Sequence, residues 1–399
     1  MEEWKEYKIE ETSIEMIDGD RGKNYPKNNE FFTEGYCLFL NAGNVTKNGF
    51  SFSENSFITR EKDDALRKGR LERNDVVITT RGTVGNVAIY DMKVPFEHIR
   101  INSGMLILKS GNDILPEYLY YYLKGNTFQT QISQYVSGSA QPQLPKGTLA
   151  KMSISFPQNK DIQKIIITIL KSLDDKIEVN RRINDNLEQQ AQALFKSWLI
   201  NCDDEVTIGD LSINITDYTK CEQKQVVLIN SSDVTEGRFE HHNLSENKNL
   251  KGHFKKRFQK GDILYSQVRP RNRHWGYCTF NADNYLASTQ LMVIRNKPEV
   301  ISSILLYQYI IEDNVWMDFT LRTETRSGTF PQGNYEDLSS IKVPFGADIE
   351  EISKNLESIY SLIYNNEIES RRLATLRDTL LPKLMSGEPK VNEVEKEIS

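Results

Sequence analysis

Two long stretches of the chain place apolar residues at every seventh position. The first, Asp161–Ile200, contains no glycine or proline, and the second begins at Asp348. Their heptad positions coincide at a fixed offset: Ile166, Leu173, Asn180, Leu187 and Leu194 in the first, and Ile352, Ile359, Asn366, Leu373 and Leu380 in the second. A sustained seven-residue repeat is typical of a coiled coil. The pattern predicts helices at 158–200 and 346–387, each about 60 Å long at a rise of about 1.5 Å per residue.

Neither helix can leave its apolar stripe in water, so we expect the two helices to pair. The duplication favours an antiparallel pair, in which Asn180 and Asn366 meet near the middle. A buried asparagine at such a position costs stability but fixes the register of the helices. The alternative is that both asparagines lie on a solvated edge. Pro382 is expected to kink or end the second helix early, and Gly387 to stop it.

The segments before the two helices also resemble each other. Asn74–Thr79 (NDVVIT) returns as Gly261–Ser266 (GDILYS), and Leu119–Leu123 (LYYYL) returns as Leu306–Ile310 (LYQYI). Short β-branched and aromatic runs predict strands, and Pro116–Gly125 has the proline and glycine that flank a short helix. We therefore expect an α/β (α+β) fold of two similar mixed domains, joined by an antiparallel coiled coil with a pseudo-two-fold repeat. The expected domains are 1–157 and 201–345, and residues 388–399 form an acidic tail.

Composition narrows the class of protein. The 399 residues predict two or three domains, and the net charge of −6 means that any nucleic-acid binding must rest on local charge. The four cysteines are scattered without a C-x-x-C pair, which favours a reduced, cytoplasmic protein without structural zinc. Because there is no run of about 18 apolar residues, we expect no membrane segment.

One segment of the second domain concentrates basic residues. Between Lys248 and His274 the only acid is Asp262. The basic residues there are Lys248, Lys251, Lys255, Lys256, Arg257, Lys260, Arg269, Arg271 and Arg273, with aromatic residues among them. Such a patch suits phosphate contacts, and guanidinium groups can address guanine. A solvated lysine-rich loop is the alternative.

The first domain gives a weaker signal for DNA contact. Its candidate cations include Arg70 and Arg81, but acids lie among them, and the Arg81–Gly85 run is equally natural as a hairpin turn. The amides of Gln141, Gln143 and Gln332, in similar loops of the two domains, suit adenine readout. Arg326 precedes the second of these loops. As turn residues, all of these glutamines are just as natural.

No catalytic motif can be found in the chain. It contains no G-x-G, no Pro-Pro dipeptide and no G-K-[ST] phosphate loop, which argues against a nucleotide or S-adenosylmethionine site. The five histidines lack metal-protease spacing, and we identify no converging acidic cluster for a nuclease metal. We expect no catalytic, cofactor-binding or metal-binding residue in this chain, and we place catalysis on other proteins.

The order of domain, helix, domain and helix resembles the specificity (S) subunits of type I restriction-modification systems. The resemblance covers nearly the whole chain. It is carried by the repeated Asn74-Asp-Val-Val-Ile and Gly261-Asp-Ile-Leu runs and by three helix segments, Ser172–Ile183, Ala193–Trp198 and Leu376–Gly387. It implies a non-catalytic reader of double-stranded DNA in a bacterial or archaeal cytoplasm. Each domain would read half of a bipartite target, and the coiled coil would set the spacer between the halves.

The same resemblance implies partners. Two modification (methyltransferase) subunits would bring S-adenosylmethionine and adenine methylation, and restriction subunits would bring ATP-dependent translocation and Mg²⁺-dependent cleavage. The alternatives are the recognition subunit of a related restriction-modification enzyme and a coiled-coil scaffold that binds nucleic acid without sequence preference. A self-contained methyltransferase or nuclease is disfavoured by the missing motifs.

Overall fold

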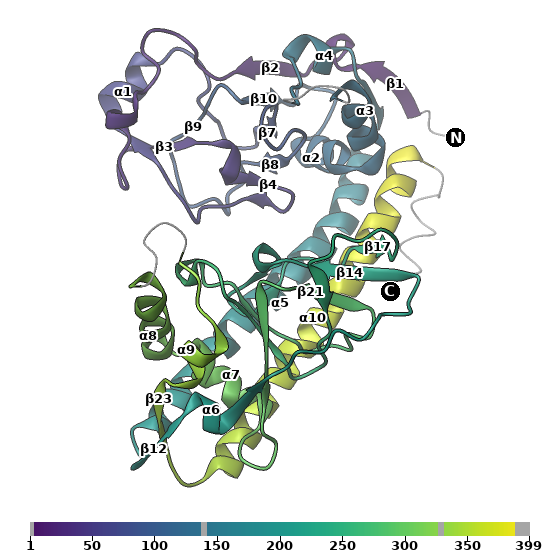
Figure 1. Cartoon of the computed structure of the whole chain (residues 1–399). Coiled ribbons are helices and arrows are strands. Elements are labelled where there is room, and N and C mark those ends of the chain that lie inside the picture. Colours follow the sequence, from purple (N-terminus) through teal and green to yellow (C-terminus); the bar gives the residue numbers. More distant parts are fainter. Residues whose placement is uncertain (1–3, 137–141, 326–330, 388–399) are drawn as a thin grey trace. The chain divides into compact units, whose positions relative to one another are not determined.

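The computed structural model describes residues 4–136, 142–325 and 331–387 of the chain. It divides into two compact units, and the division falls within both long helices. Unit 1 comprises Met1–Glu178 with Ser370–Ser399, and unit 2 comprises Val179–Glu369. Each unit therefore contains one mixed domain together with half of each long helix (Figure 1).

Unit 1 is built on a four-stranded antiparallel sheet in the order β2-β10-β7-β8. These strands are Glu15–Asp18, Met105–Lys109, Val76–Thr79 and Val87–Ile89. A second sheet, β6-β3-β9, consists of Phe57–Ile58, Cys37–Leu40 and Ile99–Ile101, and its β3 and β9 are parallel. Two strand pairs complete the sheets: β1 (Trp4–Lys8) with β11 (Ser153–Pro157), and β4 (Val45–Thr46) with β5 (Gly49–Phe50). The helices are α1 (Arg60–Ala65), α2 (Pro116–Lys124), α3 (Asn126–Val136) and α4 (Lys146–Ala150).

Unit 2 repeats this plan. Its sheet β13-β22-β19-β20 comprises Ser212–Asn214, Leu291–Asn296, Ile263–Ser266 and Trp275–Tyr277. The sheet β17-β14-β21-β18 comprises Leu244–Glu246, Gln225–Ile229, Tyr285–Ser288 and Phe254–Lys256, with β14 and β21 parallel. The remaining pairs are β12 (Asp204–Thr207) with β23 (Lys342–Phe345), and β15 (Val234–Thr235) with β16 (Arg238–Phe239). The helices are α6 (Ile208–Leu211), α7 (Ser303–Ile311), α8 (Asp313–Glu324) and α9 (Tyr335–Ser339). The predicted duplication of a mixed α/β domain is confirmed.

The repeated Asn74-Asp and Gly261-Asp pairs have a structural reason. Asn74 and Gly261 both adopt a left-handed backbone, with φ of 75° and 90°, just before strands β7 and β19. The aspartate that follows is buried in each case and accepts a hydrogen bond of 2.8 Å from the backbone N–H three residues earlier. A left-handed residue favours glycine or asparagine, so this turn limits the choice at both positions.

The two long helices are α5 (Lys160–Leu199) and α10 (Ile349–Ser386). Within unit 2 they run antiparallel, because Asn180 contacts Glu369 while the later Asn184 contacts the earlier Ile363. The heptad residues Ile166, Leu173 and Leu380 lie in the core of unit 1, and Ile352 lies in that of unit 2. The other heptad positions are partly buried and pack against these cores: Leu373 in unit 1, and Leu187, Leu194 and Ile359 in unit 2. The predicted antiparallel pair of long helices is confirmed.

Of the two effects expected of Pro382, a kink or an early end of α10, the early end does not occur. Pro382 lies inside the helix and does not end it, because α10 continues to Ser386. The proline removes only the hydrogen bond that its own nitrogen would donate to the preceding turn, and few residues follow it. Gly387 then has a φ of 74°, the left-handed conformation that commonly follows the last helical residue.

No helix in the described part of the chain is long and apolar enough to cross a membrane.

Candidate nucleic-acid interface

The arginine-rich loop of unit 2 connects β19 to β20 and contains the short 3-10 helix η5 (Pro270–Asn272). Both residues that flank η5, Arg269 and Arg273, adopt a left-handed backbone, with φ of 50° and 52°. The loop is tied down by the indole N–H of Trp316, which donates a 2.9 Å hydrogen bond to the Pro270 carbonyl oxygen. The loop is therefore a defined structure that presents Arg269 and Arg271 to solvent.

The side chains of Arg271 and Arg273 have different surroundings. Arg271 is 72% exposed, and its guanidinium makes a two-pronged contact with the carboxylate of Glu324 on α8. This contact raises the pKa of Arg271 and lowers that of Glu324, because each charge stabilises the other. Arg273 is half-buried, lies 4.2 Å from the ring centre of Trp316 and donates to Asp313 at 3.2 Å. Arg271 is thus exposed but paired with Glu324, whereas Arg273 helps to hold the loop.

The structure brings the arginine loop together with the predicted glutamine loop. Val268 and Gln332 form a single antiparallel bridge. Two backbone hydrogen bonds flank the bridge: Arg269 N–H donates to the Pro331 oxygen at 3.0 Å, and Gly333 N–H donates to the Gln267 oxygen at 2.8 Å. The exposed side chain of Gln332 therefore lies next to the arginine loop.

Unit 1 has the same arrangement at the equivalent place. Arg81 and Gln143, both exposed, form a single antiparallel bridge after β7, as Val268 and Gln332 do after β19. The residues around them line a cavity of about 290 Å³. Two of the lining cations, Arg21 and Lys146, were missed by sequence reasoning. Lys146 could have been found from its position just after the repeated glutamine loop, whereas no local signal marks Arg21.

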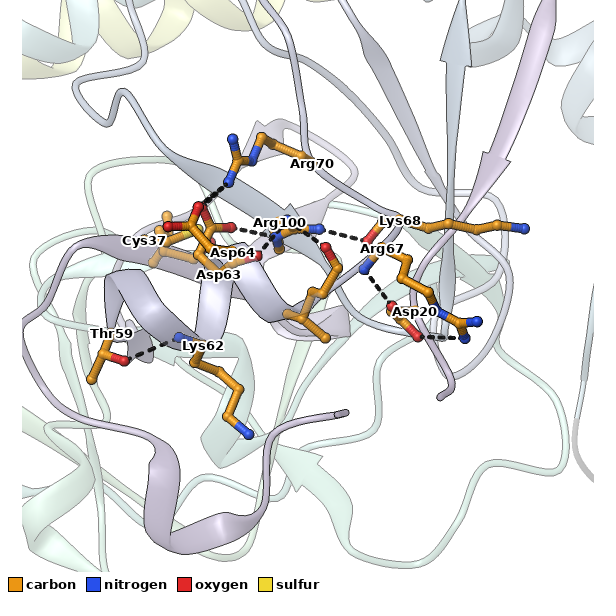
Figure 2. Close-up of polar contacts among 12 residues, drawn as sticks. Asp20, Cys37, Thr59, Lys62, Asp63, Asp64, Arg67, Lys68, Arg70 and Arg100 are labelled. Atoms are coloured by element: carbon orange, nitrogen blue, oxygen red, sulfur yellow. Dashed lines mark hydrogen bonds and ion pairs between the residues drawn. The ribbon is translucent and has the colours of Figure 1, made fainter. Parts of the chain in front are cut away.

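Arg70 belongs to a different cluster of unit 1, which Figure 2 shows. Its guanidinium contacts the carboxylate of Asp63, which is fully buried on α1. The same carboxylate accepts from Arg100, which is 4% exposed and also donates to the Lys68 carbonyl oxygen at 2.8 Å. The side chain of Arg70 remains 46% exposed, so part of its guanidinium can still reach a ligand.

The other basic candidates lie on or beside β18. This strand belongs to the sheet β17-β14-β21-β18, whereas the arginine loop joins two strands of the other sheet. Lys255 is exposed, and its ammonium lies 4.8 Å from the ring centre of Tyr218. Arg257 is half-buried and donates to the Asp283 carbonyl oxygen at 2.7 Å. Lys256 requires a correction, because it is 6% exposed and donates to the Leu291 carbonyl oxygen at 2.6 Å. Burial lowers its pKa, and in this conformation its ammonium is not available to a phosphate.

Two further candidates, Gln141 and Arg326, lie outside the described residues. Among the described residues, no group of three or more histidine, cysteine, aspartate and glutamate side chains is arranged to hold a metal ion.

The two heptad asparagines both lie between α5 and α10 in unit 2. The side-chain amide of Asn180, which is 1% exposed, donates to the Glu369 carboxylate at 2.8 Å and to the Asn366 carbonyl oxygen at 3.4 Å. The Asn366 amide donates instead to the side chain of Asn184 at 2.8 Å. Asn184 and Glu369 are therefore the partners that sequence reasoning did not identify. Their role in fixing register stays a prediction.

The duplicated architecture matches a known family. The family model described as "Type I restriction modification DNA specificity domain" matches this chain over residues 1–189 and again over residues 204–377. The chain belongs to this family. Since the two matches cover both mixed domains and most of both long helices, the family unit corresponds to one domain with a long helix.

Curated relatives carry the name of the same type I specificity family, and one solved structure shares the fold. The specificity subunit of the type I restriction enzyme HindI from Haemophilus influenzae is 35% identical over 175 residues, which cover 43% of this chain and 38% of the relative. The specificity subunit of the type I restriction enzyme MjaIX from Methanocaldococcus jannaschii is 24% identical over 356 residues, covering 81% of this chain and 79% of the relative. The crystal structure of a type I restriction-modification S subunit from M. genitalium has a TM-score of 0.51 at 16% identity and covers 96% of both chains. This likeness establishes a shared fold.

Proposed function

We propose that this chain reads a bipartite DNA target for a type I restriction-modification complex. Unit 1 and unit 2 would each read one half of the target. The proposal rests on a β-bridge that occurs in both units. In each unit it joins the loop that follows β7 or β19 to a glutamine loop: Arg81 pairs with Gln143, and Val268 pairs with Gln332. Each bridge places an exposed amide beside an exposed arginine, Arg81 in one unit and Arg269 in the other. These are the groups that recognise adenine and guanine edges in the major groove.

The long helices would serve as the spacer between the two readers and as the dock for partners. Two half-sites on one face of B-DNA lie about 34 Å apart, or a multiple of that distance. A helical pair holds such a distance better than a flexible linker, whose end-to-end distance fluctuates. Two modification subunits would dock on this chain, and restriction subunits would join the complex.

Catalysis in this proposal belongs to the partner subunits. They would bind S-adenosylmethionine, ATP and Mg²⁺ for adenine methylation, translocation and cleavage. Methylation of an adenine requires the base to leave the helical stack, so the reader must hold a distorted duplex. This chain would contribute phosphate and base contacts that keep the target in place during that step.

The decisive experiment exchanges one domain. Residues 201–345 are replaced by the corresponding domain of another specificity subunit, and methylated sites are mapped across the host genome by single-molecule sequencing. We expect one half of the methylated target to change while the other half and the spacer stay the same. A change in both halves would show that the two units do not read independently.

A further inference from the structure

A cavity of about 240 Å³ in unit 2 borders the arginine loop at Arg273, but neither Arg269, Arg271 nor Gln332 of the proposed DNA-reading edge lines it. It is bounded by α5, α7, α10, the start of α8 and the turn between β15 and β16. Four aromatic side chains form much of its wall: Phe195, Trp275, Tyr307 and Tyr360. Its lining carries four carboxylates and two cations: Glu188, Glu236, Glu312, Asp313, Lys196 and Arg273. The net charge of the lining is therefore negative, and aromatic faces also attract cations.

A buried acceptor in the wall of this cavity has no partner among the described residues. Gln308 on α7 is 1% exposed, and its amide N–H donates to the Tyr360 hydroxyl at 2.8 Å. Its carbonyl oxygen accepts no hydrogen bond from the described residues. Leaving a buried polar atom unpaired is costly, so the site is suited to a ligand that donates hydrogen bonds.

Unit 1 contains a cavity of about 510 Å³ at the equivalent place. The internal repeat aligns Tyr121 with Gln308, Asp378 with Gln192 and Leu381 with Phe195, and each of these residues lines its own cavity. The two cavities thus lie at corresponding places on the repeated helices: α2 corresponds to α7, and the second half of α10 corresponds to the second half of α5. The loops around the two cavities differ.

The wall of the unit 1 cavity includes a guanidinium from the chain itself. Arg377 on α10 lines the cavity and donates to the Asp174 carboxylate at 2.7 Å. The same carboxylate accepts from the Tyr121 hydroxyl at 2.9 Å. At the offset of 186 between the long helices, the counterpart of Arg377 is Ala191, which is fully buried. Position 191 of unit 2 therefore supplies no guanidinium. Arg238 does lie 3.8 Å from the Glu188 carboxylate, but it also pairs with Asp185 and does not line the cavity.

We propose that the unit 2 cavity binds a guanidinium group from outside the chain, between Glu188, Gln308 and the aromatic wall. A planar guanidinium donates several hydrogen bonds in one plane and stacks on aromatic rings, which matches the acceptors and faces present. Of the two cations at the cavity, Arg273 already pairs with Asp313, and Lys196 is exposed. Neither cation therefore donates a hydrogen bond to the side-chain oxygen of Gln308, which has no partner among the described residues.

The surroundings of Glu188 add a pH dependence. Burial raises the pKa of its carboxyl to about 7, Arg238 opposes this rise, and the nearby Asp185, Glu367 and Glu236 reinforce it. Other charged side chains that line the cavity are Lys196, Arg273, Glu312 and Asp313. A bound guanidinium favours the ionised carboxylate, so binding should tighten as the pH rises from 6 to 8 and should release a proton near pH 7.

Calorimetric titration of the full chain with propylguanidinium tests the proposal directly. At pH 8 we expect one site with a dissociation constant on the order of 1 mM, since a ligand of this size gains limited contact energy. Propylurea, which has nearly the same shape without the charge, should bind at least about tenfold more weakly. Absence of binding, or equal binding of the two compounds, would overturn the proposal.

Variants locate the site. Glu188→Gln should weaken propylguanidinium binding about tenfold, and Gln308→Leu should weaken it as well. The matched control is Glu357→Gln, which removes an exposed carboxylate from α10 outside the cavity and should leave binding unchanged. Ala191→Arg should abolish binding by supplying the guanidinium internally, as Arg377 does in unit 1. If the first two variants both fold and bind like the parent chain, the site is not this cavity.

A final comparison identifies the source of the guanidinium. This comparison rests on the proposed function. Assembly with the cognate modification subunit is measured with and without saturating propylguanidinium. Competition assigns the group to an arginine of that subunit, and undisturbed assembly assigns it to a free small molecule. The titrations above need neither DNA nor a partner, so they stand or fall separately from the DNA-reading proposal.

Discussion

The side-chain amide of Asn366 on α10 donates a 2.8 Å hydrogen bond to the side-chain oxygen of Asn184 on α5. One turn of α5 earlier, Asn180 reaches Glu369, so polar contacts cross between the helices at two successive turns. We expect these groups to satisfy one another only in this register, because buried polar groups without partners are costly.

Asn180→Ala should lower the free energy of unfolding by about 1–3 kcal/mol, because it removes the buried partner of Glu369. Asn365→Ala is the matched control, since Asn365 is exposed on α10, and it should change the free energy by less than about 0.5 kcal/mol. Urea denaturation of both variants measures the difference. Equal effects at the two positions would place Asn180 outside the set of interactions that hold the register.

Arg271→Ala should weaken binding of the complex to its DNA target by about 1–3 kcal/mol without lowering thermal stability, because the side chain is 72% exposed. Glu324→Gln should strengthen binding, since it releases the guanidinium from its internal partner. Fluorescence anisotropy at several salt concentrations measures both effects. Arg372→Ala, at an exposed position of α10, is the control and should leave affinity unchanged. A loss of affinity as large in the control would point to general charge rather than the loop.

Gln143→Ala and Gln332→Ala should each relax base preference in a different half of the target, by about 1–3 kcal/mol at the affected position. The reason is that each amide lies beside the arginine loop, or its counterpart, of one unit only. Binding to a library of duplexes with single base changes measures the preference. Gln189→Ala, an exposed amide on α5, serves as control. If both glutamine variants altered the same half-site, the assignment of one half to each unit would be wrong.

Asp63→Asn should lower the stability of unit 1 by about 3–5 kcal/mol, because the buried Arg100 would lose its counter-charge (Figure 2). Asp64→Asn, at a side chain 62% exposed, should cost less than about 1 kcal/mol. Hydrogen exchange of the amides in β3 and β9 reports on this part of unit 1. Similar small losses in both variants would mean that the buried pair is replaceable.

Asp75→Asn should change how stability depends on pH. Burial raises the pKa of Asp75 from its ordinary value of 3.8 to about 6. Between these values the folded chain holds a proton that the unfolded chain has lost, so the free energy of unfolding falls as the pH rises through this window. At pH 7 the variant should regain up to about 3 kcal/mol relative to the parent chain.

Denaturation of the parent and Asp75→Asn chains at pH 4.5 and pH 7 measures this change. Asp113→Asn changes an exposed residue and is the control. In this variant the free energy of unfolding should still fall between pH 4.5 and pH 7. A parent chain whose stability stayed flat or rose across the window would contradict the assignment to Asp75.

Much of the architecture could be predicted from the sequence, because the heptad periodicity and the internal repeat are visible in the order of the residues. The heptads predicted α5 and α10, since burial of an apolar stripe depends only on spacing along a helix. The repeated runs that begin at Asn74 and Gly261 marked equivalent segments, and the structure gives the reason, because few residues accept the left-handed backbone found at both positions. The basic run from Lys248 to Arg273 identified a cationic segment, but charge alone does not say which side chains are free.

The tertiary structure decided what those side chains contact. It buried Lys256, directed Arg273 onto Trp316 and left Arg271 exposed, although all three belong to the same basic run. It also placed Gln143 beside Arg81, 62 positions away, and left the side-chain oxygen of Gln308 without a hydrogen bond from the described residues. An internal repeat shows which residues of the two domains are equivalent. The burial of a side chain and the choice of its partner depend instead on segments that are distant in the sequence and come into contact only when the chain folds.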